Sequence, residues 1–364
     1  MKNLPIYEIP QNKKYWLIKT DGGDIYDHFI SFGVMAIGHL DILDFNIASD
    51  QAFYPNKEQL RHSLTLAHRK DDRKKGYTTN HLAQINTFIY EVNVGDWVIA
   101  KGSNCISIGR VQGSPVINKA PYTLYKKKNN IDVLTEMKHS LRRKVEWGPK
   151  IKTKNLPHAL KYSLGARQSL YSIDKHEIAI HHMLYPYFKK SSDLYLSFKI
   201  LKSEDIDNFS VTKILNFLNE LEVLSKTFEV EESYELADFE RHFNSFISNH
   251  SFQLTTKAGF YSEGDIWAKL GFNKKFKNHQ RMFYAIVIYA MIFGNDHLGM
   301  QGIIDVESRQ KLWAVVAKRM EVNFINESVN NLKLENPDYD TKTIENNEGD
   351  EDPSVKVSAL KPPS

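Results

Sequence analysis

The sequence predicts an α+β fold in which a curved, mixed, β-barrel-like domain precedes a smaller α+β domain and a disordered acidic tail. A chain of 364 residues is long enough for about two or three domains. Short strands alternate with helices between Trp16 and Ile173. The composition changes around residues 186–192, and beyond Asn326 the chain is acidic and poor in large apolar residues. We therefore expect a first domain, a second domain and a tail at residues 10–185, 190–325 and 326–364.

Residues 15–38 predict a compact unit of strand, turn, helix and strand. An apolar strand leads into an acidic turn made of Asp21, Gly22 and Gly23. One or two helical turns follow, and a second strand then ends at Gly38. The unit groups an aromatic side chain, backbone amides and acidic side chains around one concavity. Such a concavity suits the recognition of a flat, polar ligand such as a nucleobase.

The rest of the first domain alternates helices with strands. Apolar residues at helical spacing predict helices at residues 56–75 and 80–90. Residues 94–100 and 105–111 predict two strands of a hairpin, joined by a short Gly-Ser-Asn connection. A strand that carries its arginines on one face, a short helix and a further strand are expected at residues 141–147, 156–160 and 170–173.

The second domain is predicted from one strand followed by helices. The strand is expected at residues 194–201, and helices are expected at residues 211–226, 234–249 and 313–320. The most apolar run, residues 282–293, is about a dozen residues long and falls short of the ~20 that cross a bilayer. A buried core helix is the expected structure there, and a membrane-inserting effector is the alternative.

Composition narrows the class of protein. The chain is 41% hydrophobic and 25% charged, which is ordinary for a soluble globular protein. Cys105 is the only cysteine, so an intramolecular disulfide and a thiolate zinc cluster are excluded. The N-terminus lacks the apolar stretch of a signal peptide, so we expect a cytoplasmic protein that does not act at a membrane.

The modest net charge of +4 conceals a strongly basic stretch. Residues 126–175 hold thirteen lysines and arginines against four acidic residues, a local net charge of +9. An excess of this size is typical of a surface that contacts phosphates, although a solvated basic face is the alternative. The predicted phosphate contacts are Lys126, Lys127, Lys128, Arg142, Arg143, Lys144, Lys152, Lys154 and Arg167.

Three tryptophans of the first domain are candidates for an aromatic cage. Trp16, Trp97 and Trp147 all lie on or beside predicted strands. An aromatic ring that stacks on a base contributes about 1–3 kcal/mol. Beside Gly22 and Gly23, the acceptor of hydrogen bonds from exocyclic amino groups would be Asp21, Asp24 or Asp27. The alternative is that the tryptophans are ordinary core residues.

Catalytic patterns are not supported by the sequence. Asp305, Glu307 and Lys311 superficially resemble a metal-dependent nuclease, but the spacing of the last two suits a helical surface pair. His176 and His181 are five residues apart and do not align on one helix face to bind a metal. Neither a phosphate-binding glycine loop nor a serine nucleophile elbow occurs. We expect no catalytic residues, no metal and no cofactor.

The order of motifs in the first half of the chain resembles the EVE-like, PUA-type N-terminal domain of Mrr-type modification-dependent restriction endonucleases. The segments that carry this resemblance are residues 16–38, 94–98, 108–113, 142–147 and 164–173. The resemblance implies a curved, β-barrel-like fold that reads modified bases in DNA, or sometimes in RNA. It also implies a pocket near Trp16, the Asp21–Gly23 turn and Trp97.

The expected function is therefore a nucleic-acid-binding sensor of a modified base in restriction or anti-phage defence, with DNA favoured over RNA. The chain departs from the family because it lacks a recognisable nuclease half. Alternatives are a restriction endonuclease with an unrecognised site, a sensor coupled to a membrane-acting effector, and a structural adaptor without nucleic-acid binding. The second domain is expected to be an effector or to form a homo-oligomer.

Overall fold

The computed structural model is a mixed α+β structure that describes most of the first two-thirds of the chain. The described residues are 4–45, 48, 51–69, 77–128, 131–165, 168–201, 206–231, 236–258, 264–271, 285–286, 332–335 and 357–360. They form two compact units. Residues 12–179 form the half-barrel unit, and the described parts of residues 4–11 and 180–360 form the second unit.

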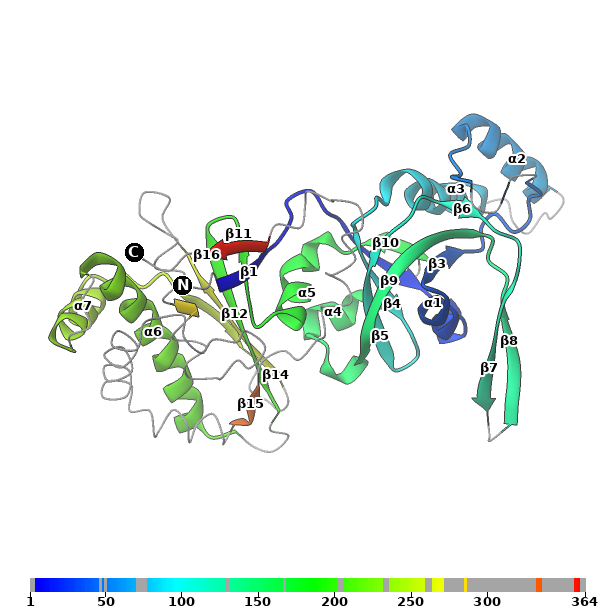
Figure 1. Cartoon of the computed structure of the whole chain (residues 1–364). Helices are drawn as coiled ribbons and strands as arrows, with labels where there is room; N and C mark the ends of the chain where they lie inside the picture. Colours follow the sequence, from blue (N-terminus) through cyan, green and yellow to red (C-terminus); the bar gives the residue numbers. More distant parts are fainter. Residues whose placement is uncertain are drawn as a thin grey trace. The chain divides into compact units, whose positions relative to one another are not determined.

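The half-barrel unit is built on a curled sheet (Figure 1). The strands follow one another in the order β10 (Leu170–Ser172), β2 (Tyr15–Lys19), β4 (Trp97–Lys101), β5 (Cys105–Val111), β9 (Leu141–Lys152) and β3 (Val34–Ile37), and β6 (Val116–Ile117) also pairs with β9. The β2–β4 pair is parallel and the other pairs are antiparallel. The predicted hairpin of β4 and β5 is confirmed.

A bulge bends the long strand β9. Ser107 pairs with Lys150 and Gly109 pairs with Trp147, so Gly148 and Pro149 together oppose the single residue Ile108. An extra residue of this kind bends a strand and reverses the alternation of its side chains. A proline is tolerated at such an irregularity because it has no N–H to donate to the sheet. The bulge therefore contributes to the curvature of β9 in Figure 1.

Helices pack against the curled sheet. α1 (Tyr26–Phe32) ends at Gly33, which adopts a left-handed conformation with φ of 60°. α2 (Lys57–Arg69) begins after Asn56, whose side chain accepts hydrogen bonds from the first-turn amides. α3 (Tyr77–Asn86) continues into a π-helical turn at Thr87–Glu91. Their apolar residues, including Phe29, Leu64 and Phe88, pack into one core with the strands.

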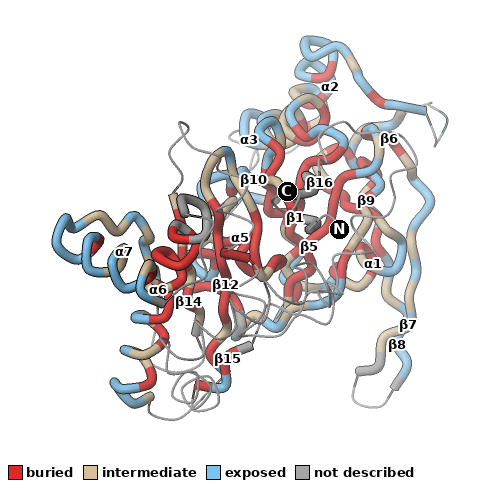
Figure 2. The backbone as a smooth tube through the Cα atoms, turned by 60° about the vertical axis from the view of Figure 1, so that its left-hand side comes forward, coloured by how far each residue is buried: buried red, intermediate tan, exposed pale blue. Residues whose placement is uncertain are grey.

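An antiparallel hairpin that the sequence analysis did not predict leaves the edge of the half-barrel unit. It consists of β7 (Tyr122–Lys128) and β8 (Ile131–Met137), which pair only with each other. The hairpin lies against α1, where the Tyr122 ring stacks on Phe32 at 4.3 Å between ring centres. Figure 2 shows that burial is concentrated in the central strands, whereas α2, α7 and this hairpin are largely exposed.

The second unit contains a separate sheet. Its strand order is β13 (Thr255–Ala258), β14 (Gly264–Leu270), β12 (Asp193–Ile200), β11 (Tyr187–Lys190), β1 (Leu4–Glu8) and β16 (Val357–Leu360), with β15 (Leu334–Glu335) beside β12. Its described helices include α5 (Glu177–Leu184), which spans the unit boundary between Ala179 and Ile180, α6 (Asn208–Glu231) and α7 (Leu236–Ser248). The N-terminal strand β1 thus belongs to the second unit.

Several expectations for the C-terminal part fall outside the described residues. These are the helix at residues 313–320, the cluster of Asp305, Glu307 and Lys311, and all of the apolar run at 282–293 except Ala285 and Ile286. Most of the tail is also outside, but β15 and β16 are strands, which corrects the expectation of disorder at those segments. No helix among the described residues has both the length and the apolar run required to span a membrane.

Candidate functional site

The tryptophans predicted to form one cage lie on different faces of the curled sheet. Trp16 pairs in register with Val98 on β4, whereas Trp97 pairs with Tyr15 on β2. Register partners share a face and successive residues alternate between faces, so Trp16 and Trp97 point in opposite directions. Both are buried, at 3% and 2% exposure, and Trp16 Nε1 donates to Asp96 Oδ2 at 2.9 Å.

Trp147 shares a face with Trp16 and lies three strands away from it in the sheet. Trp16, Val98, Gly109 and Trp147 are successive register partners across four strands. Three strand spacings correspond to about 14 Å. Trp147 is half-buried and donates through Nε1 to Val34 O at 3.1 Å. The predicted cage is therefore corrected to core packing.

The two arginines predicted to contact phosphates are also buried. Arg142 and Arg143 are 1% and 2% exposed and, as neighbours on β9, point to opposite faces, which corrects the expectation that they share one. Arg142 donates to the carbonyls of His139 and Ala120, both at 2.7 Å. Arg143 donates to the carbonyls of Phe88, Gly113 and Ile89 at 2.9, 3.0 and 3.0 Å. These guanidinium groups bind backbone carbonyls inside the fold and do not present themselves to phosphates.

The predicted lysines have different environments. Lys144, Lys152 and Lys154 are exposed, but the bulge places Lys144 on the face opposite to Lys152. Lys126 is half-buried and forms an ion pair with Asp27 Oδ2 at 3.1 Å. The side chains of Lys127 and Lys128, and all of Arg167, lie outside the described residues. A single continuous basic face made by β9 is therefore not formed.

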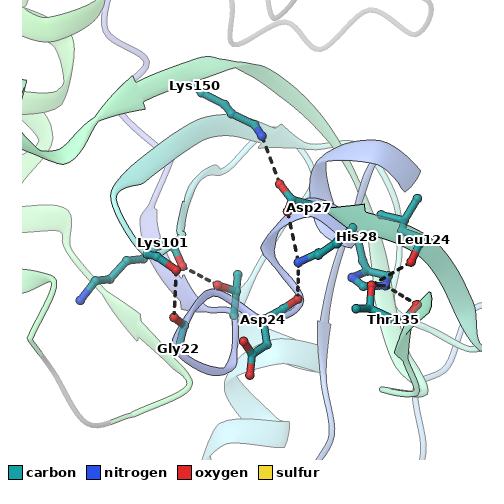
Figure 3. A network of polar contacts seen from close by, with 11 residues as sticks. Gly22, Asp24, Asp27, His28, Lys101, Leu124, Thr135 and Lys150 are labelled. Atoms are coloured by element: carbon teal, nitrogen blue, oxygen red, sulfur yellow. Dashed lines mark hydrogen bonds and ion pairs between the residues drawn. The ribbon is translucent and has the colours of Figure 1, made fainter. Parts of the chain in front are cut away.

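A polar network holds the Asp21–Gly23 turn and the start of α1 (Figure 3). Asp27 forms ion pairs with Lys150 of β9 and with Lys126 of β7, both at 3.1 Å. Lys126 also donates to Asp24 O at 2.7 Å. His28 Nε2 contacts Thr135 O on β8 at 3.1 Å. Three separate parts of the unit are thereby tied to α1.

The turn itself requires glycine. Gly22 and Gly23 have φ values of 73° and 108°, which L side chains rarely adopt. A Cβ atom on Gly23 would lie 2.5 Å from Ser103 Oγ, so the turn packs directly against the β4–β5 connection. Asp21, at the start of the turn, is exposed.

Asp21 belongs to a cluster of acidic residues and histidines drawn from three segments. His139, between β8 and β9, lies 2.8 Å from Asp21 Oδ2 through Nε2 and 3.1 Å from Asp41 Oδ2 through Nδ1. Asp41 is held by Ser140, whose N and Oγ donate to Asp41 Oδ1 at 2.8 and 2.7 Å. A Cβ atom on Gly38 would lie 2.4 Å from the His139 ring, so the 38–41 turn fits closely beside it.

The two carboxylates change the charge of His139. Burial by itself lowers the pKa of His139, but the hydrogen bonds and charges of Asp21 and Asp41 outweigh it and raise the pKa to about 9. Both ring nitrogens then carry hydrogen and donate to a carboxylate. The hydrogen bond from His139 in turn lowers the pKa of Asp21. At neutral pH the group is an imidazolium between two carboxylates.

The neighbouring His39 has the opposite charge state. Burial, together with the charges of His81 and His139, lowers the pKa of His39 to about 4, so its imidazole is neutral at pH 7. Its ring stacks on His81 with 4.4 Å between ring centres. Within the described part of the chain, buried His39 Nε2 has no hydrogen-bond partner. We call Asp21, His39, Asp41 and His139 the histidine–aspartate cluster.

The histidine–aspartate cluster combines acceptors, a fixed cation and a neutral imidazole at one edge. Among the described residues, no group of three or more side chains has a geometry that could hold a metal ion. Comparison of the chain with protein-family models, curated proteins and solved structures finds no match.

Sequence reasoning identified one member of the histidine–aspartate cluster and missed the other three. Asp21 was singled out with its two glycines, but Asp41 and His139 are separated from it by the β3 strand and the β7–β8 hairpin. No local motif links these segments. The only sequence signal was the presence of polar residues directly after the expected strand that ends at Gly38.

Proposed function

We propose that the half-barrel unit binds nucleic acid, DNA in preference to RNA, and contacts the hydrogen-bonding edge of a modified base through the histidine–aspartate cluster. The observation that carries this proposal is the convergence of Asp21, His139 and Asp41 from three segments at the edge of a curled sheet. In this proposal the histidine–aspartate cluster takes the place of the predicted tryptophan cage.

The chemistry of the histidine–aspartate cluster suits a nucleobase. The partly exposed carboxylates of Asp21 and Asp41 accept hydrogen bonds from amino and ring N–H groups, and His139 fixes both side chains in position. His39 lies beside these groups as a neutral imidazole at pH 7. An edge that accepts at two points distinguishes bases by their N–H pattern.

The resemblance of the first half to the EVE-like, PUA-type N-terminal domain of modification-dependent restriction endonucleases supports the ligand class. A curled mixed sheet is compatible with that resemblance. The assignment to a modified base, and to restriction or anti-phage defence, rests on the resemblance alone. The second unit is proposed to be the effector or oligomerisation part of the sensor.

Binding of fluorescent oligonucleotides to the full chain tests this proposal. Fluorescence anisotropy would compare single strands and duplexes, each unmodified or carrying one modified cytosine or adenine. Asp21→Asn is expected to lower the preference for the best ligand about tenfold, the loss typical of one good base contact. Asp24→Asn is the matched control, because Asp24 is an exposed carboxylate of the same segment outside the cluster.

Two results would contradict the proposal. One is the absence of binding to any oligonucleotide by the wild-type chain at low salt. The other is an unchanged preference among bases in Asp21→Asn, provided that this variant melts at the wild-type temperature. A gel of the same mixtures with Mg²⁺ would report strand cleavage, which is the outcome expected of an endonuclease.

A further inference from the structure

Two lysines occupy neighbouring positions at the ends of parallel strands. Lys19 ends β2, Lys101 ends β4, and the two are register partners. Partners in adjacent strands have backbones about 4.8 Å apart and side chains on the same face. Two ammonium groups are thus placed side by side on the face opposite to Trp16.

No acidic side chain compensates this pair within the described residues. Lys101 Nζ donates to Leu164 O at 3.1 Å, and neither lysine forms an ion pair there. Figure 3 shows the Lys101 side chain extending away from Asp24 and Asp27. Burial lowers the pKa of Lys19, and the charge of Lys101 lowers it further. Like charges directly opposite one another destabilise a sheet, so an anion bound between them would relieve the repulsion.

Two more lysines lie on the segment that Lys101 contacts. η4 (Thr153–Asn155) and α4 (His158–Ser163) precede Leu164, and Thr153 N donates to Asn104 O at 2.9 Å beside the β4–β5 connection. Exposed Lys161 donates to the carbonyl of exposed Lys154 at 2.8 Å. We call Lys19, Lys101, Lys154 and Lys161 the lysine patch.

The lysine patch is joined to the turn that carries Asp21. Thr20, which follows Lys19, donates through its hydroxyl to the carbonyl of Lys101. Gly23 packs against Ser103, two residues beyond Lys101. A strand whose base reaches Asp21 would therefore pass close to these ammonium groups.

We propose that Lys19 and Lys101 clamp a backbone phosphate of the nucleic-acid strand whose base contacts the histidine–aspartate cluster. This inference rests on the proposed function and assigns the residues that contact the phosphate backbone of the bound nucleic acid. Lysine binds phosphate as a point charge, so a pair of ammonium groups suits a phosphodiester without requiring bidentate geometry. Lys154 and Lys161 extend the same positive surface along the strand.

The test compares two double variants of the full chain that lose the same charge. Lys19→Gln with Lys101→Gln removes the clamp, and glutamine retains a donor for Leu164 O. Lys175→Gln with Lys257→Gln is the control, because both lysines are exposed and outside the patch. Anisotropy with the best oligonucleotide would be measured over a series of salt concentrations.

The clamp variant is expected to weaken binding equally for all base identities. Its slope of log affinity against log salt should be smaller than that of the wild type by about one, since the clamp neutralises one phosphate and each neutralised phosphate contributes about one. The control should keep the wild-type slope. A neutral methylphosphonate at the contacted linkage should weaken wild-type binding but leave the clamp variant unchanged.

The outcomes separate this inference from the proposed function. A clamp variant with the wild-type slope and an unchanged melting temperature overturns the clamp, even if Asp21→Asn still loses base preference. If Asp21→Asn keeps the wild-type base preference while the clamp variant shows a reduced slope, the clamp is retained and the base contact is overturned. Titration calorimetry with inorganic phosphate completes the test. If inorganic phosphate binds as tightly as the oligonucleotide, the assignment of the clamp to a nucleic-acid strand is overturned.

Discussion

Asp21 and His139 are 118 residues apart in the chain, yet the carboxylate and the imidazole meet at 2.8 Å. The contact joins the turn after β2 to the connection between β8 and β9. Asp41 completes it from the other side of the ring. Because the contact depends on charge, its strength should depend on pH.

The half-barrel unit should lose stability as the pH rises from about 6.5 to about 9. The pKa of His139 is raised from 6.5 to about 9 in the folded state, so its contribution is fully present below pH 6.5 and is lost as the pH rises through 9. We expect a loss of about 1–2 kcal/mol, because solvent screens the exposed Asp21. Urea denaturation at several pH values measures this, and His139→Gln should remove the dependence. A free energy of unfolding that rises over this range would contradict it.

His39 should act in the opposite direction at acid pH. Its pKa is lowered to about 4 in the folded state, so between about pH 6.5 and 4 the unfolded chain binds a proton that the folded chain does not. Stability should therefore fall by about 1–2 kcal/mol as the pH falls through this range. His39→Asn should flatten that part of the curve relative to the wild type. Equal slopes for the two proteins would refute the assignment of a neutral imidazole.

Trp16→Phe should destabilise the fold without changing base preference. Asp96 is buried and accepts hydrogen bonds from Trp16 Nε1 at 2.9 Å, Asn93 N at 2.9 Å and Lys14 N at 3.1 Å. Loss of one donor to a buried carboxylate costs about 1.5–3 kcal/mol. Trp147→Phe is the control, because its partner is a neutral carbonyl and its loss should cost less. Weaker base discrimination in a folded Trp16→Phe protein would restore the cage.

Arg143→Lys should also act on stability and leave the salt dependence of nucleic-acid binding unchanged. The three carbonyls that Arg143 holds require the planar fork of a guanidinium. Unsatisfied buried carbonyls should lower the free energy of unfolding by about 2–4 kcal/mol, which chemical denaturation would detect. Lys144→Gln changes the next residue, which is exposed, and serves as the control variant. A reduced salt slope in Arg143→Lys would mean that the arginine does reach a phosphate.

Gly109→Ala should disrupt the centre of the curled sheet. A Cβ atom there would lie 2.4 Å from Glu146 O and 2.7 Å from the Trp147 ring. Overpacking of this kind costs about 1–3 kcal/mol. Gly22→Ala has open space and only its positive φ to oppose it, so its cost should be near 1 kcal/mol. Thermal melts that rank the two variants in the reverse order would contradict the packing around Gly109.

Local pattern was sufficient to predict much of the half-barrel unit. The strand, turn, helix and strand of residues 15–38 are β2, the Asp21–Gly23 turn, α1 and β3. Strand β5 has the predicted bounds, because alternation and a glycine-containing turn define it locally. The β7–β8 hairpin was missed because its lysine-rich sequence does not carry a strong strand signal.

The candidate site was harder to predict, because it depends on register. Whether Trp16 and Trp97 share a face is decided by which residue of β2 pairs with Trp97, and one step of register reverses the answer. The bulge at Gly148 likewise reverses the orientation of Lys150 and Lys152 relative to Lys144. These are long-range properties that one sequence does not contain in local form.

The membership of β1 has a consequence for how the protein is organised. The chain begins its described part as a strand of the second unit, crosses to the half-barrel at residue 12 and returns at residue 180. Within the described residues, the half-barrel is therefore an insertion that is joined to the second unit at residues 11–12 and at residues 179–180. β1 pairs with β11, so the strands that flank the insertion are hydrogen-bonded to one another through Tyr7 and Phe188. A ligand that stiffens the half-barrel unit would constrain the second unit at both ends of the insertion. A single linker between consecutive domains would not offer this route for signalling.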